Sequence, residues 1–96
     1  MKYFTRRQVI EILSIDESFF VQLEQEDIVQ VDAGDTPQDQ GYSEIMLERA
    51  RVADNLVHEL DVNLAGVAVI VQMRENLADL RHQLEAALTE LRGRRR

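Results

Sequence analysis

The chain has 96 residues, of which 45% are hydrophobic and 5% aromatic, with no cysteine and a formal net charge of −7 at pH 7. This length supports one modest core, which must be built mainly from aliphatic side chains. The absence of cysteine excludes a disulfide framework, a thiolate metal site and a cysteine nucleophile. No signal-like segment opens the chain and no apolar run could span a bilayer, so we expect a cytoplasmic protein.

The negative charge is unevenly distributed along the chain. Residues 1–40 contain three basic and nine acidic residues, whereas residues 61–96 have a formal charge near +1 because arginines cluster at the end. The acidity therefore belongs to the N-terminal half.

Two short helices are predicted at the start of the chain. Thr5 precedes Gln8 by three residues, which is the capping-box spacing, and predicts a helix over Arg6–Leu13. Either Ser14 or Asp16 can cap a second helix. Its buried stripe is Phe19, Phe20 and Leu23, and it ends near Glu26 or Asp27. Together the two helices predict a helix-turn-helix unit.

A small hairpin is predicted after this unit. Ile28–Val31 is a short β-branched run, and the polar stretch that follows contains Gly34, Pro37 and Gly41. This pattern predicts two short strands with a loose tip that close at Tyr42, in the form of a wing.

A third helix is predicted over Ser43–Leu60, with Ser43 as its N-cap. Arg49 is the one polar residue on its expected inner face, which comprises Ile45, Met46, Arg49, Val52, Ala53, Leu56, Val57 and Leu60. Asp61 and Val62 then connect to Asn63, a plausible N-cap for a fourth helix. Gly66 lies in the first turn of that helix, where its helix-propensity cost of about 1 kcal/mol suggests a close packing partner.

The fourth helix is long and carries an a/d heptad seam. Seam residues alternate at spacings of three and four: Ile70, Met73, Leu77, Leu80, Leu84, Ala87 and Leu91. In one interpretation Ile70, Met73 and Leu77 pack on the third helix of the same chain. In the other, the seam forms a coiled coil between two subunits, and we expect this homodimer because exposed distal leucines would be an apolar liability. The expected organisation is a winged helix-turn-helix domain at residues 1–62 and a C-terminal coiled-coil helix with a basic tail at residues 63–96.

This order of elements resembles the N-terminal domain of the MerR family. The matching phrases are Thr5-Arg6-Arg7-Gln8-Val9, Ile28-Val29, Tyr42-Ser43 and, most specifically, Leu60-Asp61-Val62-Asn63-Leu64-Ala65-Gly66-Val67. The resemblance implies a mainly α fold and one of two functions. MerR regulators, including HspR heat-shock repressors, are dimers that place the second helix and wing on DNA. The similar CbpM chaperone-modulator family inhibits the DnaJ-like co-chaperone CbpA by binding its J-domain.

The charges favour the second function. A helix that enters a DNA groove normally carries basic or amide side chains, but residues 16–27 contain no lysine or arginine. Asp32, Asp35 and Asp39 make the wing acidic as well. Only Arg6, Arg7, Arg49 and Arg51 could contact a phosphate backbone, and each can equally be solvated or paired within the chain. Sequence-specific DNA binding remains the alternative.

An acidic surface suits a basic partner, and the resemblance implies a J-domain with a positively charged second helix. The candidate partner-binding residues lie on the second helix and wing: Asp16, Glu17, Glu24, Glu26, Asp27 and Asp32. Acidic residues are also common on any soluble surface, so the cluster matters more than any one member.

No enzymatic activity, metal or cofactor is expected. His58 and His82 lie on different predicted helices and lack a companion ligand at helical spacing, so both are expected at the surface. The arginines from Arg92 to Arg96 follow a helix C-terminus, where a solvated basic end is expected.

Overall fold

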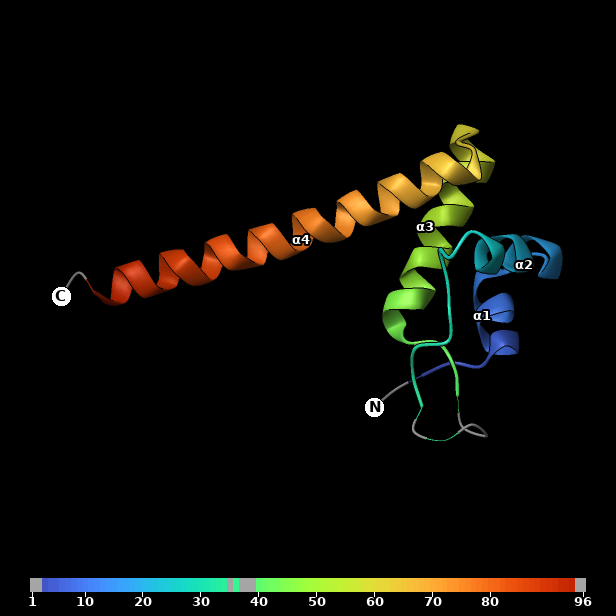
Figure 1. Ribbon diagram of the computed structural model, residues 1–96, viewed down its shortest axis with the longest axis horizontal. Helices are drawn as coiled ribbons and strands as arrows, with labels where there is room; N and C mark the ends of the chain where they lie inside the picture. Colours follow the sequence, from blue (N-terminus) through green and yellow to red (C-terminus); the bar gives the residue numbers. More distant parts are fainter. Residues whose placement is uncertain (1–2, 35, 37–39, 95–96) are drawn as a thin grey trace.

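The computed structural model describes residues 3–34, 36 and 40–94. In these residues four helices follow one another: α1 (Arg6–Leu13), α2 (Glu17–Gln25), α3 (Glu44–Leu60) and α4 (Leu64–Gly93). Figure 1 shows α1, α2 and α3 gathered at one end and α4 running away from them, in a molecule that measures 57 × 36 × 19 Å. The predicted mainly helical fold with a long C-terminal helix is confirmed. We call α1, α2, α3 and the loop between α2 and α3 the head.

The start of α1 has the predicted capping box. The Gln8 N–H donates to Thr5 Oγ1 at 3.2 Å, and the Thr5 N–H donates to Gln8 Oε1 at 2.9 Å. Two amides that the helix leaves without partners are thereby satisfied. The helix ends at Leu13, and Ser14 follows in a left-handed conformation with φ 53°.

Helix α2 is stabilised mainly by the burial of its apolar side chains. Asp16 is its N-cap but makes no side-chain capping bond, whereas Phe19, Phe20 and Leu23 are buried. The helix is shorter than the predicted range to Glu26 or Asp27. It ends at Gln25 because Asp27 is left-handed, with φ 58°, and the Ile28 N–H then turns back to the Leu23 carbonyl at 2.9 Å.

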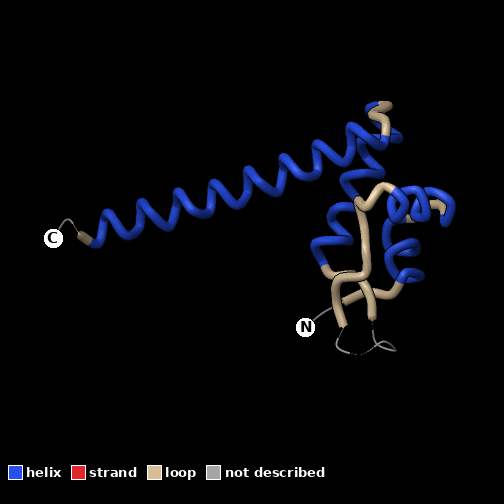
Figure 2. Tube along the Cα trace, in the orientation of Figure 1, coloured by secondary structure: helices blue, strands red, loops and turns tan. Residues whose placement is uncertain are grey.

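The wing is held by single bridges instead of the two predicted strands. Antiparallel bridges join Ala33 to Gly41 and Phe4 to Tyr42, and Figure 2 shows no strand among the described residues. Gly34 has a φ of 101°, which glycine adopts readily. The expected tip residues Asp35, Pro37 and Asp39 lie outside the described residues.

Helices α3 and α4 begin at the predicted caps. Ser43 Oγ accepts from the Met46 N–H at 3.4 Å, and Asn63 Oδ1 accepts from the Gly66 N–H at 2.7 Å. A Cβ added at Gly66 would lie 3.0 Å from a methyl group of Val62. The close neighbour that the sequence suggested is therefore the connector itself.

One core joins the head to the first turns of α4. Phe20, Leu23, Ala50, Ala53 and Val67 are fully buried at its centre. Two expected members of the α3 face are exposed, Ile45 at 59% and Leu60 at 68%. They lie near the two ends of α3, where no described element covers them, while Ala50 takes the central place. Every residue from 76 to 94 is exposed, so the distal part of α4 projects from the head.

Candidate functional site

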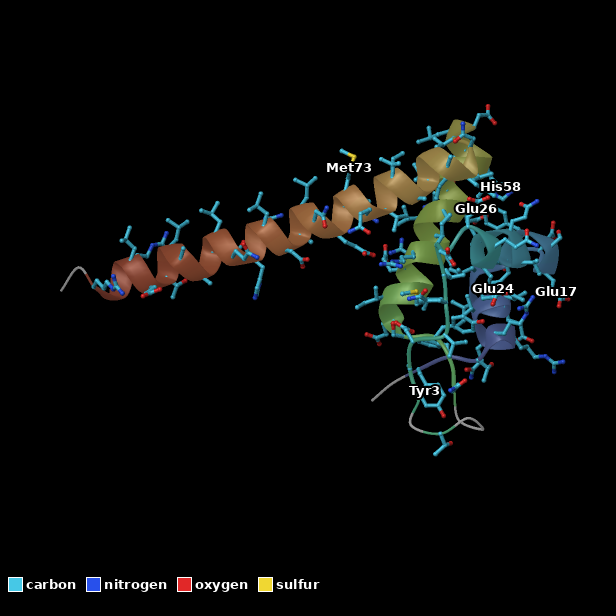
Figure 3. All side chains as sticks on the ribbon, in the orientation of Figure 1. Tyr3, Glu17, Glu24, Glu26, His58 and Met73 are labelled. Atoms are coloured by element: carbon cyan, nitrogen blue, oxygen red, sulfur yellow. The ribbon has the colours of Figure 1, made fainter. Side chains whose placement is uncertain are left out.

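The acidic residues singled out from the sequence fall into two groups in the structure. Half-buried Glu24 and exposed Asp32 make side-chain hydrogen bonds within the head, whereas Asp16, Glu17, Glu26 and Asp27 are exposed and make none among the described residues. Figure 3 shows Glu17 at the outer edge of the head and Glu24 further in, beside α1. These two groups have different chemical roles.

Glu24 links α1, α2 and the end of the wing. Its carboxylate accepts a hydrogen bond of 2.6 Å from Arg6 and one of 3.0 Å from the Tyr42 hydroxyl. The Arg6 guanidinium lies 4.9 Å from the centre of the Phe20 ring, over its face. Burial, and then the bond to Glu24, raise the pKa of Tyr42. Glu24 is therefore part of the internal structure of the head.

Asp32 ties the wing to the start of α3. One carboxylate oxygen accepts from the Ser43 N–H at 2.7 Å, and the other accepts from the Ser43 hydroxyl at 2.5 Å. Because Ser43 is itself the N-cap of α3, Asp32 holds the cap residue in place. This carboxylate is engaged in the head before any partner arrives.

The exposed acids form the part of this surface that a partner can reach. Glu17 has a 76% exposed side chain and only a long contact of 3.8 Å to Arg6. Glu26 and Asp27 follow the end of α2, and within the described residues neither makes an ion pair. We call Asp16, Glu17, Glu26 and Asp27 the acidic surface. Asp27 also lines a cavity of about 150 Å³ between the end of α2 and α4.

The basic side chains of the head are largely neutralised within the chain. Arg6 pairs with Glu24, Arg51 pairs with Glu48, and Arg49 pairs with Glu75. Arg7 is exposed and is without an ion pair in the described part of the chain. Helix α2 contributes no lysine or arginine. The head therefore offers little positive potential to a phosphate backbone.

Arg49 connects α3 to α4 through a two-bond ion pair. Its Nε and one terminal nitrogen each donate to the Glu75 carboxylate at 2.7 Å, and the other terminal nitrogen donates to the Ile28 carbonyl at 3.3 Å. The hydrogen bond from Arg49, opposed by burial, lowers the pKa of Glu75. Of the two expectations for this arginine, the pairing within the chain is confirmed.

The heptad seam faces away from α3. On the side of α4 that meets the head, Val67 and Val71 are buried and Glu75 pairs with Arg49, whereas Met73 and Leu77 are 56% and 64% exposed. Figure 3 shows Met73 directed away from α3. The interpretation in which Ile70, Met73 and Leu77 pack on α3 is therefore wrong for Met73 and Leu77, because α3 contacts the opposite side of the helix, whereas Ile70 is half-buried. Further along α4 the exposed apolar side chains are Leu80, Leu84, Leu88 and Leu91.

The two histidines have ordinary surroundings. His58 is 4.8 Å from the Phe19 ring, in an edge arrangement, and its Nδ1 lies 2.8 Å from an Asp54 carboxylate oxygen. His82 is exposed on α4. Among the described residues, no group of three histidine, aspartate or glutamate side chains could hold a metal ion, and no helix is long and apolar enough to cross a membrane.

Sequence reasoning missed the long-range polar contacts of Glu24, Asp32 and Arg49 and part of the exposed apolar surface. The bonds of Glu24 to Tyr42 and of Arg49 to Glu75 join residues 18 and 26 positions apart, a separation that no local pattern reveals. The one available signal was the position of Arg49 on an otherwise apolar helix face. Val69, exposed at 59%, adjoins the seam without belonging to its heptad positions.

A family described as MerR HTH family regulatory protein matches residues 4–89 of the chain. This match covers α1, α2, the wing, α3 and most of α4. No curated protein and no solved structure matches the chain significantly.

Proposed function

The chain belongs to the MerR helix-turn-helix regulatory family. We propose that, within this family, it is a non-enzymatic chaperone modulator, which binds the J-domain of a DnaJ-like co-chaperone and inhibits it. The observation that carries the proposal is the charge of the head. The helix that DNA-binding relatives would place in a groove has no basic side chain, and Arg6 and Arg49 beside it are paired with carboxylates.

The acidic surface suits the positively charged second helix that the resemblance to CbpM implies for the partner. Glu17, Glu26 and Asp27 project from the two ends of α2, where a basic helix could lie across them. Complementary potentials of this kind accelerate encounter and reject wrong partners, and salt screens them. Glu24 and Asp32, by contrast, support the shape of this surface through their hydrogen bonds to other residues of the head.

We also propose that the active form is a homodimer that pairs along the seam. In a single chain the apolar side chains of this seam are exposed, with Leu77 and Leu80 each above 60%. An exposed row of apolar side chains along a projecting helix lowers the solubility of the chain unless a second helix covers it. A dimer would carry two acidic surfaces and could hold two J-domains.

The test of J-domain binding is a calorimetric titration of the isolated J-domain at low and at high ionic strength. The test variant is Glu26→Lys with Asp27→Asn, since asparagine tolerates the left-handed backbone of Asp27. The matched control is Glu85→Lys with Asp79→Asn on the exposed distal part of α4. Both variants raise the formal net charge from −7 to −4.

We expect a salt-sensitive complex that the test variant weakens roughly tenfold and the control leaves nearly unchanged. The proposal fails if the unmodified chain does not bind at low ionic strength, or if both variants weaken binding equally. In the second case the net charge, and not the acidic surface, would be responsible.

The second candidate is a DNA-binding transcription regulator of the HspR type. The family match itself favours it, because the matching family is described as regulatory and helix-turn-helix. This function predicts a promoter complex that weakens steeply with salt. The same test variant should then strengthen binding, because it removes negative charge beside the phosphates, so one variant separates the two functions.

A further inference from the structure

The attachment of α4 to the head has an uneven distribution of contacts. The buried residues of α4 are Val67 and Val71, both within its first eight residues, and the residues from 76 onward are exposed. The pair between Glu75 and Arg49 is the strongest polar contact beyond Val71, since Arg74 reaches Glu48 only at 3.9 Å. The apolar contacts are therefore close to the connector, while the Glu75 pair is further along the helix.

Two grooves that are open to solvent lie between α3 and α4 beside this pair. One groove of about 190 Å³ is lined by Glu48, Val52, Val71 and Ala78 beside the paired side chains. A second, of about 360 Å³, includes Ile45 and Asp79. Side chains packed to the density of a protein core would resist a change of angle, but these grooves hold no such side chains. Beyond Val71, the angle between the helices thus depends mainly on the Arg49–Glu75 pair.

We propose that Arg49 is a latch that sets the direction in which α4 leaves the head and ties this direction to the backbone at the end of α2. Its guanidinium holds Glu75 by two hydrogen bonds and the Ile28 carbonyl by a third, so three elements meet at one side chain. Because the planar guanidinium binds the carboxylate through two parallel hydrogen bonds, it fixes the orientation of the Glu75 side chain as well as its distance, which a lysine could not do.

The length of α4 amplifies any movement at the latch. At 1.5 Å per residue, Glu75 lies about 18 Å along the helix from Asn63, and Gly93 lies about 45 Å from it. A displacement of about 2 Å at Glu75 therefore becomes about 5 Å at Gly93. In a homodimer that pairs along the seam, the latch would also set the separation of the two acidic surfaces. The latch itself does not rest on the proposed function.

The test is a distance distribution between spin labels on the head and on α4. The chain has no cysteine, so Ser18→Cys on α2 and Ala86→Cys on α4 give two defined labels at exposed positions. Labelled chains are diluted with an excess of unlabelled chains, so that distances between copies do not contribute. Glu75→Gln and Arg49→Met remove the latch, and Glu85→Gln is the matched control on the same helix.

We expect a narrow distribution in the labelled parent and in the Glu85→Gln control, and a clearly broader one in both latch variants. Arg49→Lys, which keeps the charge without the two-bond geometry, should give an intermediate width. Far-ultraviolet circular dichroism shows whether each variant retains its helices. An unchanged width in a folded Glu75→Gln or Arg49→Lys chain would overturn the latch.

Discussion

Arg6 on α1 donates a hydrogen bond of 2.6 Å to Glu24 on α2, and this bond joins two helices through residues that are 18 positions apart in the sequence. The same carboxylate accepts from Tyr42 at 3.0 Å, so it joins the helix-turn-helix unit to the last residue of the wing. An acidic residue that looks available for a partner in the sequence is thus part of the internal structure of the head.

Glu24→Ala should destabilise the chain much more than Glu26→Ala. The first change leaves the Arg6 guanidinium and the Tyr42 hydroxyl without their acceptor, a loss of about 1 to 3 kcal/mol. The second removes an exposed side chain and should change the free energy of unfolding by less than about 0.5 kcal/mol. Urea denaturation of the two variants measures the difference. Equal losses would mean that the Glu24 bonds contribute nothing to the stability of the fold.

Asp32 and Ser43 should be energetically coupled. Ser43→Ala removes the N-cap of α3, at a cost of about 1 kcal/mol. Asp32→Ala removes the acceptor for both the Ser43 N–H and its hydroxyl. Because the two changes remove a shared interaction, the double variant should be less destabilised than the sum of the single variants, by about 0.5 kcal/mol or more. Strict additivity in a double-mutant cycle would contradict the bond.

The stabilisation from the Arg49–Glu75 pair should disappear in acid. The hydrogen bond from Arg49 lowers the pKa of Glu75, so the folded chain keeps this carboxylate charged at a lower pH than the unfolded chain does. The contribution is therefore complete above the ordinary glutamate pKa of 4.5 and is lost as the pH falls through the lowered value. We expect the native chain to exceed Glu75→Gln in stability by about 1 kcal/mol near neutral pH.

The measurement is urea denaturation of both chains at neutral pH and at a pH of about 3, below the ordinary range of glutamate. The difference in the free energy of unfolding should shrink on acidification. A difference that stays constant would show that the charge of Glu75 does not stabilise the fold.

Gly41→Ala should destabilise the chain because the added methyl group would clash with a neighbouring backbone atom, and not because alanine cannot adopt the backbone conformation. A Cβ at this position would lie 2.5 Å from the Phe4 carbonyl oxygen, which is a backbone atom and cannot turn aside. We expect a loss of about 1 to 3 kcal/mol, as for other insertions into filled space. Gly93→Ala is the control, since no atom lies within 4 Å of its added Cβ. Thermal unfolding should show a lower midpoint for the first variant alone.

The elements of this fold follow from local signals that the sequence displays. Thr5, Ser43 and Asn63 all cap the helices that they were expected to cap, because a cap depends on residues within one turn. The roles of Glu24 and Asp32 could not be predicted, since their partners Arg6, Tyr42 and Ser43 become neighbours only when the chain folds. The same holds for the side of α4 that meets α3, which long-range packing at Val67 and Val71 decides.

The seam of α4 should control the association of two chains. Leu80→Glu places a charge in the middle of the exposed stripe, whereas Ala86→Glu places the same charge at an exposed position of the same helix outside the heptad seam. A buried, unpaired carboxylate in a coiled coil is costly, so the first variant should lower the fraction of dimer at a given concentration by at least tenfold and the second should not. Sedimentation equilibrium measures the mass of each chain directly. A monomeric parent, or a dimer that tolerates Leu80→Glu as well as Ala86→Glu, would show that the two chains do not pair along this seam.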